Sequence, residues 1–123
     1  MQLLRLEGRS AVYLSAISEA ELRFGMAKGP KHPVRIAMME RFLAKATVLA
    51  WGREEAAAYG ELRAGLQAAG SPLGALDTLI AAHALAADAV LVTHDKAFHR
   101  LKLVNLNRKL QVVDWATDLP VLL

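Results

Sequence analysis

The sequence predicts an α/β fold in which a short parallel sheet is flanked by helices. Apolar runs with the composition of buried strands recur along the chain, at Val12–Leu14, Val48–Ala50, Ala89–Thr93 and Leu110–Val113. Helical patterns separate these runs, and strands joined by helices are expected to be parallel with right-handed crossovers. No repeat or low-complexity segment interrupts the 123 residues, so we expect one domain over residues 1–123.

Two helices are expected in the first half of the chain. Ser18 and Glu21 have the spacing of a capping box, which predicts a helix over Glu19–Met26. Two prolines then prevent continuation, and apolar residues at helical spacing predict the next helix over Val34–Ala44. The first apolar residues, Leu3–Leu6, have the appearance of the tail of a helix.

The second half contains the clearest helical patterns. An amphipathic helix is predicted over Glu54–Ala69, with an acidic first turn and a glycine directly after it. The run Gly74–Ala86 is almost wholly apolar and carries one carboxylate, Asp77, near its start. A helix that is apolar on every side belongs in the protein interior. Trp115 is expected to pack beneath the last strand.

Composition indicates a globular protein. Hydrophobic residues make up 54% of the chain and charged residues 22%. No apolar run reaches the ~18–20 residues of a membrane span, and Met1–Glu7 lacks the charged and apolar regions of a signal peptide. The chain has no cysteine, which excludes disulfides and thiolate metal sites and is compatible with the cytoplasm.

The net charge of +3 permits a polyanionic partner without requiring one. The basic residues gather in two segments: Lys28, Lys31, His32 and Arg35, then Lys96, His99, Arg100, Lys102, Arg108 and Lys109. Four of them are candidates for phosphate contacts: Lys28, Lys31, Lys96 and Arg100. Solvated surface charge is the alternative interpretation for each.

Three acidic residues fall where open α/β sheets bind ligands, beyond the carboxyl ends of the strands. They are Glu21, Asp77 and Asp95. Carboxylates about 6 Å apart repel by roughly 3 kcal/mol per pair at an effective dielectric constant near 20. A divalent cation removes this repulsion, and Mg²⁺ or Mn²⁺ suits oxygen ligands better than zinc does. Such a site is equipped for phosphodiester hydrolysis.

Each of these residues also has a purely structural interpretation. Glu21 is equally a capping-box acid, Asp77 a helix-start acid and Asp95 a turn residue. Thr93 either presents its hydroxyl to the cluster or simply ends a strand.

The histidines and tryptophans are expected to be structural. His83 is predicted to be a hydrogen-bonded core residue, and His94 a loop residue rather than a ligand. Trp51 and Trp115 are predicted to serve packing.

Four segments together resemble a known family. Ser15–Gly25 resembles the segment that carries the second acid of PIN-domain ribonucleases, specifically VapC-type toxins of toxin–antitoxin pairs. Leu73–Ala84 is similar to the third-acid helix, and Leu91–Phe98 resembles the strand and fourth acidic or amide position. Val112–Trp115 resembles the closing strand. The resemblance runs from Ala11 to Trp115.

This resemblance implies a PIN-like fold and a magnesium or manganese site formed by Glu21, Asp77 and Asp95, with Thr93 assisting. It implies endoribonuclease action on structured RNA, with tRNA or ribosomal RNA as the usual targets. It also implies a homodimer and a small VapB-like antitoxin that blocks the active site.

The chain departs from the family in one respect. The family begins with a strand that ends in an Asp-Thr-Asn-like motif, and no such motif precedes Ala11. That strand lies at the centre of the family's sheet, so its absence is expected to leave two strand edges unpaired. A start codon assigned too far downstream, a sequence that lost its beginning and a decayed gene are the competing explanations, and a truncated form of an ordinary member is favoured.

Two other functions remain open on the sequence. One is a catalytically inactive PIN remnant that acts as an antitoxin-binding or dimerisation module, which the missing acid favours. The other is a PIN-fold domain of RNA processing.

Overall fold

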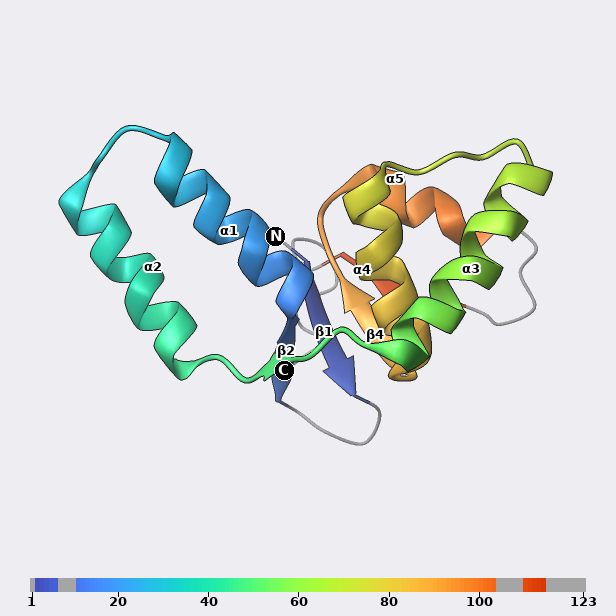
Figure 1. Cartoon of the computed structure of the whole chain (residues 1–123), viewed down its shortest axis with the longest axis horizontal. Helices are drawn as coiled ribbons and strands as arrows, with labels where there is room; N and C mark the ends of the chain where they lie inside the picture. Colours follow the sequence, from blue (N-terminus) through green and yellow to red (C-terminus); the bar gives the residue numbers. More distant parts are fainter. Residues whose placement is uncertain (1, 7–10, 104–109, 115–123) are drawn as a thin grey trace.

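A computed structural model describes residues 2–6, 11–103 and 110–114, with only the backbone of Lys102 and Leu103. Its sheet has five strands in the order β3-β2-β1-β4-β5 (Figure 1). The strands are β1 Leu3–Leu6, β2 Val12–Ser15, β3 Val48–Leu49, β4 Ala89–Val92 and β5 Val112–Val113. The helices are α1 Ala16–Lys28, α2 Pro33–Lys45, α3 Arg53–Ala68, α4 Ala75–Ala86 and α5 Lys96–His99, followed by a 3₁₀ turn at Arg100–Leu103.

The expectation for the first residues was wrong. Leu3–Leu6 is not the tail of a helix but the central strand β1, which pairs with β2 on one side and β4 on the other. Leu4 lies opposite both Tyr13 and Leu91 and is 1% exposed. Short apolar runs do not distinguish helix from strand, and here two strand edges with unsatisfied backbone groups select the strand. The gap expected at the centre of the sheet is therefore filled.

The direction of β1 makes the sheet mixed rather than wholly parallel. β1 is antiparallel to both neighbours, whereas the pairs β2–β3 and β4–β5 are parallel. Only residues 7–11 separate β1 from β2, too few for the crossover that a parallel pair needs. The predicted α/β class, with helices flanking a short sheet, is confirmed.

The start of α1 also differs from the prediction. Ser15, not Ser18, is the N-cap: its backbone is extended and its Oγ accepts a hydrogen bond from the N–H of Ile17 at 3.1 Å. The helix therefore begins at Ala16. Ser18 lies inside the first turn and Glu21 lies beyond it, so Glu21 is not a capping-box acid. The capping-box interpretation of Glu21 was wrong because two serines competed for the same role.

The helices fall into two groups around the sheet. α1 and α2 form a hairpin that projects from one side, and α3 packs against α4 on the other (Figure 1). As predicted, α4 is largely interior, with every residue from Ile80 to Leu85 buried. The core extends from α3 through α4 to Leu91 and Phe98. Within the described residues, no helix has the length and apolar character required to cross a bilayer.

The structural interpretations of His83 and Trp51 are confirmed. His83 is 3% exposed, and its Nδ1 lies 2.7 Å from the Oγ of Ser15. Burial lowers the pKa of His83, which keeps the ring neutral near pH 7. The indole N–H of Trp51 donates to the carbonyl oxygen of Leu79 at 3.0 Å. Trp115 lies outside the described residues.

Candidate active site

Asp77 lies in the first turn of α4, the most apolar helix of the molecule. The helix follows Gly74, which is its N-cap without a side-chain cap, and the hydroxyl of Thr78 donates to the Gly74 carbonyl at 2.8 Å. Asp77 itself is partly buried. Burial raises the pKa of the Asp77 carboxyl, and the negative charge of Asp95 raises it further. Both causes mark a carboxylate that lacks a compensating positive charge.

Glu21 lies on α1, facing the same region. Its Oε1 is buried and has no hydrogen-bond partner among the residues that the structure describes. Burial raises the pKa of the Glu21 carboxyl, and the charge of Asp77 adds to that shift. A buried carboxylate oxygen without a donor is costly, and the nearby like charge increases the cost.

Asp95 follows β4 and is the N-cap of α5. Its Oδ1 accepts a hydrogen bond from the N–H of Ala97 at 2.9 Å, and its own N–H donates to Thr93 Oγ1 at 3.0 Å. Thr93 is fully buried. The Thr93 hydroxyl therefore fixes the backbone that carries Asp95, a contact that neither sequence interpretation of Thr93 anticipated.

Asp77 is electrostatically linked to both other predicted site residues. Its charge acts on Glu21, and the charge of Asp95 acts on Asp77. Even so, the described part of the chain contains no group of three or more His, Cys, Asp or Glu side chains placed to hold a metal ion. Asp77 is thus the carboxylate that links Glu21 and Asp95 through charge, without forming a three-ligand cluster with them.

The donor chemistry of this region suits a hard divalent cation. All three predicted side chains offer carboxylate oxygens, and the unpartnered Glu21 Oε1 is an acceptor that a cation would satisfy. A cation would also cancel the repulsion that raises the pKa values of Glu21 and Asp77. The residues present therefore fit Mg²⁺ or Mn²⁺, although the side chains would have to draw together around it.

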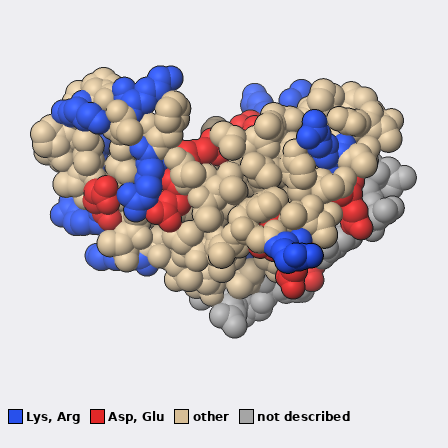
Figure 2. Space-filling view, in the orientation of Figure 1, with Lys and Arg blue, Asp and Glu red and all other residues tan. Residues whose placement is uncertain are grey.

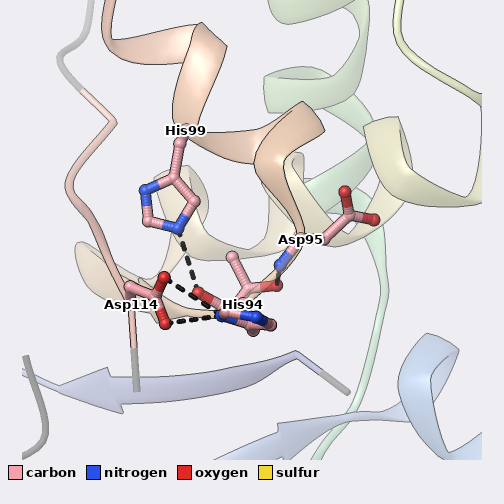
Figure 3. Close-up of polar contacts among 5 residues, drawn as sticks. His94, Asp95, His99 and Asp114 are labelled. Carbon is pink, nitrogen blue, oxygen red and sulfur yellow. Dashed lines mark hydrogen bonds and ion pairs between the residues drawn. The ribbon is translucent and has the colours of Figure 1, made fainter. Parts of the chain in front are cut away.

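A second polar cluster adjoins Asp95 and was missed in the sequence. His94 Nδ1 lies 3.0 and 3.1 Å from the two carboxylate oxygens of Asp114, and His99 Nε2 lies 3.0 Å from the Thr93 carbonyl oxygen (Figure 3). In that view the Asp95 carboxylate points away from the His94–Asp114 pair. Val113 pairs with Val92 in parallel strands, so Asp114 comes directly after β5 beside the end of β4. The ends of neighbouring parallel strands lie side by side, and this was the signal in the sequence that could have identified Asp114.

A groove runs from Glu21 between α1 and α2. It has a volume of about 240 Å³ and is lined mainly by apolar residues, and its polar lining residues are Glu21, His32 and Arg35. On the same hairpin, Phe24, Val34 and Met38 are more than half exposed. Figure 2 shows acidic side chains at the floor of the hollow between this hairpin and the rest of the molecule.

The basic residues of the hairpin have local partners. Lys31 Nζ donates to the carbonyl oxygens of Met26 and Ala27 at 3.1 Å each, and so caps the end of α1. Lys28 Nζ lies 5.5 Å from the centroid of the Phe24 ring. Lys96, which directly follows Asp95, and Arg100 are exposed. Arg108 and Lys109 lie outside the described residues, as does the side chain of Lys102.

Comparison with known proteins decides the family. The sequence profile of the PIN domain matches residues 2–103. A ribonuclease VapC2 of Rickettsia felis is 34% identical over 97 residues, which cover 78% of this chain and 72% of the relative. The chain belongs to the PIN-domain family. A tRNA(fMet)-specific endonuclease VapC of Salmonella typhimurium is 32% identical to this PIN-domain protein over 93 residues, covering 75% and 70% of the two chains.

Solved structures of VapBC assemblies share the fold of this PIN-domain protein. The VapBC2 structure from Rickettsia felis, bound to a DNA fragment from the promoter, superposes with a TM-score of 0.73 and 31% identity, covering 84% of this chain and 74% of that chain. VapBC-1 from nontypeable Haemophilus influenzae gives a TM-score of 0.71 and 32% identity, covering 92% and 76%. The family predicted from the four sequence segments is confirmed.

Proposed function

We propose that this PIN-domain protein is a divalent-cation-dependent endoribonuclease and the toxin of a toxin–antitoxin pair. The observation that carries the proposal is the position of Asp77, whose carboxylate is coupled to both Glu21 and Asp95 at the mouth of an apolar helix. The relatives named ribonuclease VapC2 and tRNA(fMet)-specific endonuclease VapC support the same reaction class.

Glu21, Asp77 and Asp95 would hold the magnesium or manganese ion. Bound there, the ion would make a water molecule more acidic and neutralise charge on the scissile phosphate. The Thr93 hydroxyl keeps Asp95 in place by accepting a hydrogen bond from the Asp95 backbone N–H. The Ser15–His83 contact joins α1 to α4 and so fixes the helices that carry Glu21 and Asp77.

We further propose structured RNA, tRNA or ribosomal RNA, as the substrate in the cytoplasm. Lys96, which directly follows Asp95, and Arg100 are exposed, and they would meet phosphates of the RNA. Lys31 is a weaker candidate because it already caps α1.

The proposed regulator is a VapB-like antitoxin that binds a homodimer of this chain. The VapBC assemblies among its structural neighbours support this partner. An apolar antitoxin segment fits the groove between α1 and α2. Because Glu21 lines that groove, the bound segment would cover the Glu21 carboxylate and so block the reaction.

The direct test is cleavage of purified tRNA and ribosomal RNA by the protein. We expect discrete fragments in Mg²⁺ or Mn²⁺ and intact RNA in EDTA, since the carboxylates need a cation to bind the phosphate. Activity that persists in EDTA would remove the metal-dependent mechanism.

One observation favours the alternative, an inactive module that binds an antitoxin or dimerises. The described residues contain no ready three-ligand metal cluster. Calorimetric titration with Mn²⁺ separates the two functions, with the exposed Glu54→Gln variant as control. Mn²⁺ binding with a micromolar or lower Kd would argue against an inactive site. A protein that binds no Mn²⁺ and leaves the RNA uncleaved would favour the inactive module.

A further inference from the structure

Ser18 is the second buried polar group on α1 that the structure leaves unsatisfied. Among the described side chains, the buried atoms without a hydrogen-bond partner are Ser18 Oγ and Glu21 Oε1. Ser18 is only 3% exposed. The two ordinary uses of a helical serine are absent here: Ser15 occupies the N-cap position, and Ser18 Oγ makes no bond back to a carbonyl of the preceding turn. An alanine would fit this position at lower cost.

Helix geometry brings Ser18 and Glu21 together. Residues three apart on a helix share a face, and helical side chains lean toward the N-terminus. The Glu21 carboxyl group therefore extends over the turn that contains Ser18. The two oxygens do not bond to each other, so each is still able to accept a hydrogen bond or to bind a cation in this region.

The contacts of α1 with α4 place Ser18 on the face toward α4. At one end Ser15 contacts His83 at 2.7 Å, and at the other end the charge of Asp77 acts on Glu21. Residue numbers rise along α1 as they fall along α4, so the two helices run antiparallel here. Ser18 lies midway between Ser15 and Glu21 along α1, on the same side of the helix as both.

We propose that Ser18 is a further residue of the cation site, where its hydroxyl oxygen binds the ion or its water shell together with Glu21. This inference rests on the proposed function, because it takes the cation to be the group that both oxygens lack. It adds a neutral oxygen ligand to a set of carboxylates, which is normal for magnesium and manganese.

The test compares Ser18→Ala with Ser71→Ala, an exposed serine on the loop after α3. Without metal, Ser18→Ala is expected to raise the melting temperature, because it removes a buried hydroxyl without a partner. With Mn²⁺, its Kd should rise about tenfold in calorimetry, and the metal-induced gain in melting temperature should shrink. Ser71→Ala should match the wild type in both measurements.

Ser18→Cys gives a readout that a structural role would not produce. A thiol stands at the same place as the hydroxyl and is only moderately larger, but it prefers soft metals. We expect weaker Mn²⁺ binding and tighter Cd²⁺ binding than in the wild type. This variant also keeps the test decisive if Ser18→Ala folds poorly.

The outcomes separate the two proposals. Wild-type Mn²⁺ affinity in Ser18→Ala, with no Cd²⁺ gain in Ser18→Cys, would overturn the role of Ser18 and leave the nuclease proposal standing. A wild-type protein that binds no Mn²⁺ and cleaves no RNA would overturn both.

Discussion

Replacement of Asp77 by Asn is expected to abolish RNA cleavage and growth arrest while the fold remains intact. Asp77 is the carboxylate coupled to both other predicted ligands, so its loss breaks both pairs. The amide has nearly the same shape but no charge, so it binds a divalent cation more weakly than the carboxylate does. Cleavage assays in Mg²⁺ and expression in a host cell measure the two effects.

The same variant is expected to be more stable than the wild type when metal is absent. Burial and Asp95 raise the pKa of the Asp77 carboxyl, so the folded state disfavours the charged form. A raised folded pKa lowers stability at pH values above it, and the penalty disappears below the unfolded value of about 4. Asp77→Asn should therefore melt at a higher temperature at pH 7 in EDTA, with the difference shrinking toward pH 4.

Glu54→Gln is the matched control, because Glu54 is an exposed acid in the first turn of α3. It should cleave RNA and melt like the wild type. Cleavage by Asp77→Asn at the wild-type rate would contradict the role assigned to this carboxylate.

Replacement of Leu4 by Ala is expected to cost about 2–5 kcal/mol of unfolding free energy, the usual range for a large side chain removed from a core. Leu4 is 1% exposed and lies at the centre of the sheet, opposite Tyr13 and Leu91. Its loss weakens contacts on both neighbouring strands. Urea denaturation followed by circular dichroism measures the effect.

Leu76→Ala serves as the control, because Leu76 is 50% exposed on α4. We expect it to change stability by about 0.5 kcal/mol or less. If Leu4→Ala were equally mild, β1 could not be the central strand of the folded protein in solution.

The sequence predicted the elements whose signals are local. α2, α3 and α4 begin and end within one or two residues of the predicted bounds, because helical periodicity and terminal glycines or prolines mark them. The interior location of α4 followed from its apolar composition alone. The convergence of Glu21, Asp77 and Asp95 on one site, expected from the rule for ligand sites in α/β sheets, stays a prediction.

Features that depend on distant contacts were missed. Nothing within Leu3–Leu6 shows that β2 and β4 leave a central position open, so its strand character depends on tertiary pairing. The choice between Ser15 and Ser18 as N-cap depended on the bond between Ser15 and His83, which lie 68 residues apart in sequence. The His94–Asp114 pair likewise required the register of β4 with β5.

One divalent cation is expected to join the carboxylates of Glu21, Asp77 and Asp95. A crystal grown with Mn²⁺ tests it most directly through the anomalous signal of manganese. We predict a peak at roughly 2–2.3 Å from an oxygen of each side chain. A peak bound elsewhere, or none at a Mn²⁺ concentration that supports RNA cleavage, would contradict it.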